Sequence, residues 1–170
     1  AGGVPNYFGP QRFGRSGNNL ALARDVLSGK RVRREQRSIA ISAARSFLFN
    51  EILAARVSAG TWDCLIDGDL ANLDGSGSVF SVEAVDETLI ARCAAFDIHP
   101  TATLWGDGAP LTSAAAAGIE TDAVAGHTEL TEGLVNARID AGSRPLRLRL
   151  ADTSIEFGDG IFWLSFRLPK

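Results

Sequence analysis

The feature of this sequence that most constrains its fold is one long amphipathic stretch, "REQRSIAISAARSFLFNEILAARVSAG", at residues 34–60. An α-helix turns by about 100° per residue, so apolar residues three and four apart gather on one side. This stretch is the strongest helix pattern in the chain. The apolar side carries Ala40, Ile41, Ala44, Phe47, Leu48 and Ala55.

The adjoining face of the same helix is basic. Arginines that lie beside small hydroxyl groups can follow a phosphate backbone. The alternative is that these arginines pair with carboxylates elsewhere in the chain, and the residues alone leave both interpretations open. The side chains that fall within about 80° of one another on this face are Arg34, Ser38, Ser42, Arg45, Phe49 and Arg56.

Charge is distributed unevenly along the chain. Residues 1–56 hold ten Lys and Arg against three Asp and Glu, a net charge of +7. The remainder holds seven basic and seventeen acidic residues, a net charge of −10. A basic segment joined to an acidic body is typical of a surface that faces a polyanion, although basic runs are also common in solvated loops.

The rest of the sequence alternates between short helical and short extended patterns. Asp86 is the expected N-cap of the helix at 85–98, and Gly158 and Gly160 mark the turn of a terminal hairpin. We therefore predict an α+β fold, with helices in the N-terminal part followed by a mixed α/β segment and a C-terminal antiparallel hairpin. The expected elements are helices at 15–29, 34–60, 85–98, 113–126 and 129–142, two short strands within 65–83, a strand and turn at 99–111, and a hairpin over 144–170.

Composition is that of an ordinary globular protein, with 45% apolar and 22% charged residues. No apolar run approaches the length of a membrane span, and no signal-peptide pattern is present, so we expect a soluble cytoplasmic protein. Cys64 and Cys93 lie in apolar stretches and are expected to be buried, reduced thiols. The sequence contains no Met and stops directly after a strand pattern, so we expect a fragment, or a processed or partly ordered chain, that lacks pieces at both ends.

The residues by themselves declare no active site. His99 and His127 lack a partner at metal-binding spacing. Asp67, Asp69 and Asp74 lack the spacing and the closing Glu of a calcium loop, so they are expected to be surface turn acids. We therefore predict no metal site and no cofactor.

Eleven residues near the start, "VPNYFGPQRFG" (4–14), combine aromatic, Gly, Pro, Asn, Gln and Arg side chains, a mixture that neither a strand nor a helix favours. Together with "GNNL" (17–20) and "SAARSFLFNEILAAR" (42–56), in this order and at this spacing, they resemble the TruD family of tRNA pseudouridine synthases. The resemblance covers essentially the whole chain. Further matching segments are "IDGD" (66–69), "LWGDG" (104–108) and "FWLSFRLP" (162–169).

The resemblance implies an activity that needs neither cofactor nor metal. Family members isomerise a uridine of tRNA, uridine 13 in the bacterial enzymes, to pseudouridine, with an Asp nucleophile that acts on a base taken out of its stack. In the family this Asp lies in a Gly-Lys-Asp-type motif upstream of "NYFG", so the resemblance implies that no catalytic residue lies in this chain. We therefore expect the chain alone to be inactive and its partners to be tRNA and the missing catalytic-domain segments of the same protein.

The resemblance also divides the chain and assigns roles to its residues. It implies a helical, basic segment at 1–60, an inserted α+β domain at 61–145, and a strand hairpin at 146–170 that returns to the catalytic domain. Arg12 is the best phosphate or carboxylate partner in the motif because of its bidentate guanidinium. The expected RNA-binding residues are Arg12, Arg15, Arg31, Arg33, Arg34 and Arg45, and the residues expected to form a compact turn are Asn6, Tyr7, Phe8, Gly9, Gln11, Phe13 and Gly14.

Two functions remain open at this point. The first is part of a tRNA-modifying enzyme, and the alternative is a non-catalytic RNA-binding or scaffold module of the same architecture. Whether the "NYFGPQRFG" motif touches RNA or only packs is equally open.

Overall fold

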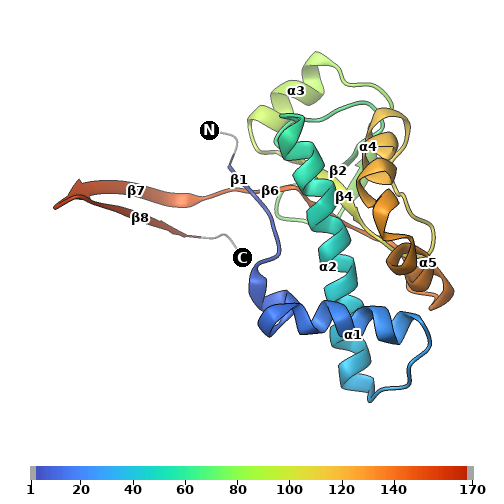
Figure 1. The fold of residues 1–170 in the computed structure, drawn as a ribbon. Coiled ribbons are helices and arrows are strands. Elements are labelled where there is room, and N and C mark those ends of the chain that lie inside the picture. Colours follow the sequence, from blue (N-terminus) through green and yellow to red (C-terminus); the bar gives the residue numbers. More distant parts are fainter. Residues whose placement is uncertain (1–2, 168–170) are drawn as a thin grey trace.

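The computed structural model of the chain describes residues 3–167 and has the predicted α+β class (Figure 1). Its helices are α1 (Asn18–Leu27), α2 (Arg34–Ser58), α3 (Glu87–Ala94), α4 (Ala114–Val124) and α5 (Thr128–Asn136), with 3-10 turns η1 (Pro10–Phe13), η2 (Arg15–Gly17) and η3 (Ala125–His127). Its strands are β1 (Val4–Pro5), β2 (Leu70–Leu73), β3 (Val79–Ser81), β4 (Ile98–Leu104), β5 (Gly142–Pro145), β6 (Arg147–Leu148), β7 (Ala151–Gly158) and β8 (Ile161–Arg167).

Helix α2 runs through the centre of the body, as its apolar face predicts (Figure 1). Leu48, Phe49, Ile52 and Leu53 are at most 1% exposed and belong to a core cluster that also draws on α1, β4 and α5. Among the described residues α2 is the one helix whose length and composition would suffice to cross a membrane, a test that core helices of globular proteins also pass. The burial of its apolar face accounts for that composition.

The main sheet is antiparallel, with the strand order β3-β2-β4-β5. Strand β4 lies between β2 and β5, and six of its seven residues are buried. A second, smaller core cluster packs α3 against this sheet. The Asp86 carboxylate accepts a hydrogen bond from the Leu89 N–H at 2.7 Å, which confirms the expected N-cap of α3.

Two expectations about this part of the chain are wrong. Cys93 is buried in the smaller cluster, but Cys64 is exposed, because it lies in the turn after α2, where its carbonyl oxygen, not its thiol, faces inward to Arg56. The terminal hairpin is also shorter than the pattern over 144–170 suggested. Leu146 is fully buried in the main core, Arg147 and Leu148 pair with β1, and the hairpin of β7 and β8 begins only at Ala151. Residues 168–170 lie outside the described residues.

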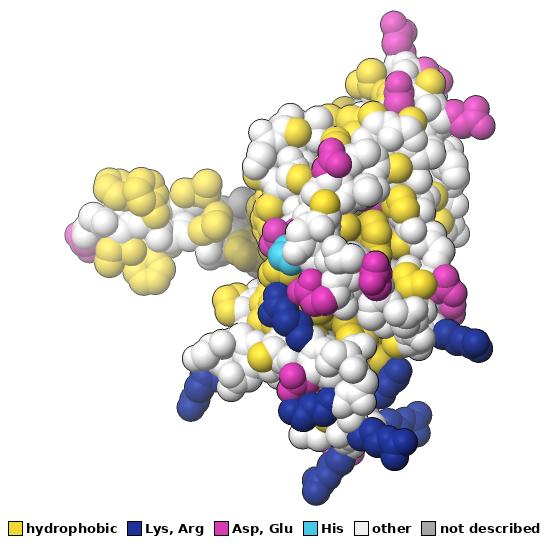
Figure 2. Space-filling view, turned by 45° about the vertical axis from the view of Figure 1, so that its right-hand side comes forward, with side chains coloured by type: hydrophobic (Ala, Val, Ile, Leu, Met, Phe, Trp, Pro, Cys, Tyr) yellow, Lys and Arg dark blue, Asp and Glu magenta, His cyan; other side chains and the backbone are white. Residues whose placement is uncertain are grey.

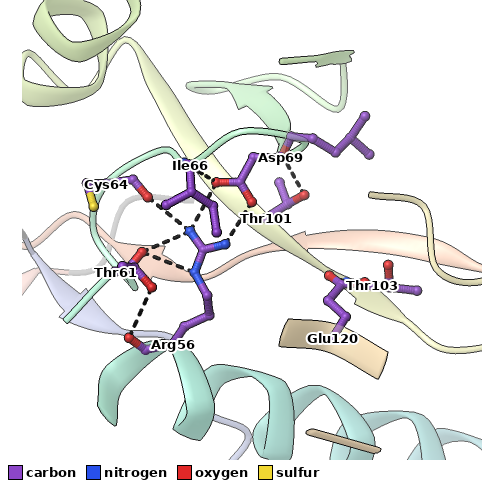
Figure 3. A network of polar contacts seen from close by, with 9 residues as sticks. Arg56, Thr61, Cys64, Ile66, Asp69, Thr101, Thr103 and Glu120 are labelled. Carbon is purple, nitrogen blue, oxygen red and sulfur yellow. Dashed lines mark hydrogen bonds and ion pairs between the residues drawn. The ribbon is translucent and has the colours of Figure 1, made fainter. Parts of the chain in front are cut away.

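Arg56 joins the C-terminal end of α2 to the sheet through a buried ion pair (Figure 3). Its guanidinium contacts both carboxylate oxygens of Asp69, at 2.8 and 3.0 Å, and also donates to the carbonyl oxygens of Thr61 and Cys64. The Asp69 carboxylate accepts a further hydrogen bond from the Ile66 N–H at 2.8 Å. Both side chains are at most 3% exposed, so the pair persists only because each charge is fully satisfied. For Arg56, pairing with the acidic body is therefore the correct interpretation of the basic helix face.

Glu120 of α4 is a second buried carboxylate, beside β4 (Figure 3). Its Oε1 accepts a hydrogen bond from the Thr103 N–H at 2.9 Å, while its Oε2 has no hydrogen-bond partner among the described residues. Burial raises the pKa of Glu120, since the charged form loses its hydration.

Substitution of Arg56→Ala is expected to lower the free energy of unfolding by about 3–5 kcal/mol, because it leaves Asp69 charged, buried and without its partner. Arg92→Ala, which removes the exposed ion pair to Asp97, is the control and should cost less than about 1 kcal/mol. Chemical denaturation measures both values. Equal small losses in the two variants would show that the buried pair does not connect α2 to the sheet.

Glu120→Gln is expected to stabilise the protein at pH 7 and to lose that advantage as the pH falls. A carboxyl whose folded-state pKa is raised contributes stability that is fully present below its unfolded-state pKa and is lost as the pH rises through the folded-state value. The Gln side chain keeps an acceptor for the Thr103 N–H and carries no charge. Denaturation curves at pH 7 and pH 4 measure the difference, and a pH-independent difference would contradict this account.

Candidate nucleic-acid interface

The segment "VPNYFGPQRFG" forms β1 and the turn η1, and Asn6 anchors it. Asn6 is 4% exposed, and its backbone N–H and side-chain amide donate to the carbonyl oxygens of Leu146 and Pro145, at 2.9 and 2.8 Å. Its Oδ1 accepts a hydrogen bond from Arg144 at 2.6 Å. The start of the chain is thereby fixed to strands β5 and β6, which lie far away in the sequence.

Phe8 fixes the next part of the motif to helix α2. The side chain of Asn50 accepts from the Phe8 N–H at 2.9 Å and donates to the Phe8 carbonyl oxygen at 3.0 Å. The Phe8 ring meets the edge of Phe49 with centroids 5.5 Å apart, and the guanidiniums of Arg144 and Arg12 lie 4.1 and 5.3 Å from its centroid. These are cation–π distances, so the ring attracts two arginines to one place.

The other residues expected in the turn have different surroundings. Tyr7 is 42% exposed, Gln11 is exposed and Phe13 is half-buried. Gly9 has an extended backbone, whereas Gly14 has a φ of 76°, which favours glycine. The motif is therefore a compact turn, held by Asn6 and Phe8, with an exposed polar side.

A groove of about 530 Å³ opens between η1, the N-terminal half of α2 and the end of β4. Arg12 crosses it and donates to the hydroxyl oxygen of Ser42 at 2.9 Å. Its lining consists of four apolar residues, four arginines and three serines. The lining residues are Phe8, Arg12, Arg34, Arg37, Ser38, Ile41, Ser42, Arg45, Ser46, Leu104 and Ile139.

Arg45 has a mainly structural position in this wall. It donates to the carbonyl oxygens of Trp105, Leu104 and Asp140 at 3.1, 3.0 and 3.0 Å. Burial lowers the pKa of Arg45, and the nearby Asp140 opposes that effect. Arg45 therefore contributes a positive charge to the groove while most of its donors hold the loop after β4.

The arginines of this groove form no ion pairs with carboxylates of the described residues, although Asp140 lies near Arg45. Among residues 3–167, no carboxylate lies within 4.0 Å of the guanidinium of any groove arginine or of Arg144. In contrast, Arg24, Lys30, Arg92 and Arg167 all have carboxylate partners at 2.5–3.2 Å. Arg12, Arg34 and Arg37, which are exposed, are thus available to an anion from outside the described residues.

The structure brings together Arg12, Arg34 and Arg45 but separates the other candidates from them. Arg31 and Arg33 are exposed in the loop between α1 and α2, where they line a different hollow with Lys30. Arg15 is exposed in η2 and lines neither hollow. Figure 2 shows that most of the visible Lys and Arg side chains gather at the end of the molecule formed by α1 and this loop, while most of the visible Asp and Glu side chains are scattered over the rest of this face.

Sequence reasoning missed two arginines of this region. Arg37 lies one helical turn after Arg34, so the helical spacing could have added it to the groove. Arg144 stands on β5 and reaches Phe8 only through the tertiary fold, so no local pattern could have indicated it.

The expectation that Asp67, Asp69 and Asp74 are surface turn acids is wrong for Asp69, which is 1% exposed because it pairs with Arg56. The Asp67 carboxylate accepts from the Val85 N–H, Asp69 pairs with Arg56, and Asp74 Oδ1 lies 2.8 Å from His99 Nε2. Among residues 3–167, no group of three or more His, Cys, Asp or Glu is arranged to hold a metal ion. Gly68 of "IDGD" and Gly106 of "LWGDG" are required by close packing, since a Cβ there would lie 1.9 or 2.1 Å from a backbone oxygen.

Comparison with known proteins gives consistent matches over the whole chain. The sequence model of tRNA pseudouridine synthase D (TruD) matches residues 25–170. The tRNA pseudouridine synthase D of Psychrobacter arcticus is 48% identical over 92% of this chain and 43% of its own length. That of Chromohalobacter salexigens is 46% identical over 99% of this chain and 49% of its own length.

A crystal structure from Methanosarcina mazei, described as that of a tRNA pseudouridine synthase D, matches the fold with a TM-score of 0.72 over 99% of this chain and 58% of that one, at 18% identity. The chain spans about half the length of the curated relatives that it matches. On the extent of the family match and the identity to these relatives, the chain belongs to the TruD family.

Proposed function

We propose that this chain is part of a tRNA pseudouridine synthase, which isomerises a uridine of tRNA, uridine 13 by the family resemblance, to pseudouridine. The support is the name shared by the curated relatives, of whose length this chain covers about half. The nucleophile belongs to segments of the protein outside these residues, so the chain alone is inactive. The whole protein acts in the cytoplasm.

The role of this chain is to bind the tRNA backbone. The observation that carries this proposal is the groove beside Phe8, where four arginines lie together without a carboxylate partner among residues 3–167. Phosphate oxygens accept charge-assisted hydrogen bonds from unpaired guanidinium groups. When the arginines bind, the counterions of the RNA backbone are released. Arg12, Arg34 and Arg37 contribute directly, and Arg45 adds its charge from the wall of the groove.

The loop arginines Arg31 and Arg33, together with Arg15, form the remainder of the proposed RNA surface. They are exposed, as Arg12, Arg34 and Arg37 are, but they lie outside the groove, so we expect each to contribute a less directional attraction. The division of 1–60, 61–145 and 146–170 assigns this basic surface to the first segment. The last segment then leads back to the catalytic domain.

The alternative, a non-catalytic RNA-binding or scaffold module, shares the same arginines and differs only in chemistry. The family names of the relatives favour the enzyme. Pseudouridine formation by the longer protein separates the two functions, whereas RNA binding alone does not.

Three double variants, each of which removes two positive charges, test the RNA surface. Arg34→Ala with Arg37→Ala is expected to weaken tRNA binding and to reduce the slope of log K against log salt by about 2, without regard to RNA sequence. Arg31→Ala with Arg33→Ala should weaken binding less. Fluorescence anisotropy with labelled tRNA over a series of salt concentrations measures each slope.

Arg24→Ala with Arg92→Ala is the matched control, since both arginines already pair with carboxylates, Glu129 and Asp97. This control should leave the slope within about 0.5 of the parent value. If it weakens binding as much as the groove variant does, the effect reports net charge only, and the groove is not the RNA-binding surface.

A further inference from the structure

The hairpin of β7 and β8 stands apart from the rest of the molecule. In Figure 1 it projects from the body beyond β6, and in Figure 2 it forms a separate arm covered with hydrophobic side chains. The two strands pair only with each other, and every residue from Asp152 to Arg167 is exposed. A two-stranded ribbon in water is marginally stable unless a third strand or another packing surface completes it.

The register divides the hairpin into two different faces. Ile155 lies directly opposite Leu164, and Phe157 lies opposite Phe162, so these four side chains share one face. Alternation along β8 adds Phe166 to the same face. We call these five residues the apolar ribbon face. Their exposed fractions are 70% for Ile155, 66% for Phe157, 74% for Phe162, 55% for Leu164 and 47% for Phe166.

The opposite face has a mixed composition. Ser154 lies opposite Ser165, and Glu156 lies opposite Trp163. Serine and glutamate side chains are at home in water, whereas five large apolar side chains in one contiguous patch are rare on the surface of a monomer. Trp163 and Ile161 are also exposed on this face, but they stand beside Glu156, Ser165 and Gly158, so the contiguous apolar ribbon face has the greater need of a cover.

The length of the relatives indicates what provides that cover. The family match runs through the hairpin to residue 170, and this chain accounts for 43% and 49% of the two relatives described above. About half of such a protein lies outside these residues. The hairpin follows β6 directly and projects away from the body, so its faces are free to contact another part of the protein.

We propose that the apolar ribbon face packs against an apolar sheet or helix surface in the part of the family protein that lies outside these 170 residues, while the face with Ser154 and Ser165 remains at the surface. This inference rests on the proposal that the chain belongs to a longer protein, and it does not depend on the reaction. The hairpin would then attach the body that carries the RNA-binding groove to the remainder of the protein.

Adjacent residues of β8 provide a matched test in the longer protein that carries this segment. Leu164→Glu places a charge on the apolar ribbon face, and Ser165→Glu places the same charge on the opposite face. Leu164→Glu is expected to lower Tm by at least about 5 °C, because an unpaired charge would be buried, and Ser165→Glu is expected to change it by less than about 2 °C. Leu164→Ala is the milder variant for the case in which Leu164→Glu does not fold, and it should also lower Tm.

In the 170-residue chain by itself, both Glu variants should leave Tm unchanged within about 2 °C, since both positions are exposed there. Equal losses from Leu164→Glu and Ser165→Glu in the longer protein would show that both faces are covered and would overturn the proposal. No loss from either Leu164 variant would also overturn it. A discrete dimer of the 170-residue chain that Leu164→Glu abolishes would make a second copy the occupant, with the same consequence.

The pseudouridine content of tRNA treated with the longer protein separates this inference from the proposed function. If the Tm pattern holds and no pseudouridine forms, the proposed function fails and the packing of the hairpin stands.

Discussion

The burial of one face of α2 is the constraint on which the rest of the structure depends. Leu48, Phe49 and Ile52 form the centre of the core, so the direction of the helix is fixed relative to the sheet. The same rotation that buries these residues turns Arg34 and Arg37 outward beside the NYFG motif. At the other end of the helix, Arg56 is drawn into the interior by Asp69. One helix thus contributes to the core, to the buried Arg56–Asp69 ion pair and to the basic groove.

Helix α2 holds the motif near the N-terminus in place. Asn50 satisfies both backbone groups of Phe8, and the Phe8 ring attracts Arg12 and Arg144. No carboxylate among the described residues forms an ion pair with these two arginines, so two positive charges gather at Phe8, and Arg12 brings one of them into the lining of the groove. The contacts that pack the motif also position its positive charges. A motif that packs against α2 is therefore compatible with one that contacts RNA.

Local patterns predicted most of the elements because their causes are local. The 3.6-residue period of α2, the Asp86 cap of α3 and the Gly158–Gly160 turn each act within a few residues. The failures depend on tertiary contacts. The burial of Arg56 needs Asp69, the position of Arg144 needs the sheet, and the divergence of Leu146 from the hairpin needs the core. The assignment of the family came from motif resemblance, and the residues alone indicated only a basic face.

The central claim is that the groove beside Phe8 brings tRNA to a pseudouridine synthase whose chemistry lies in the remainder of the protein. The most direct measurement is the pseudouridine content of a tRNA transcript after incubation with the longer protein, with its Arg34→Ala, Arg37→Ala variant and with the 170-residue chain. The account predicts pseudouridine with the longer protein, a higher KM for tRNA with little change in kcat for the variant, and none with the chain alone. Unchanged kinetics in the variant would contradict the role of the groove, and no pseudouridine with the longer protein would contradict the activity.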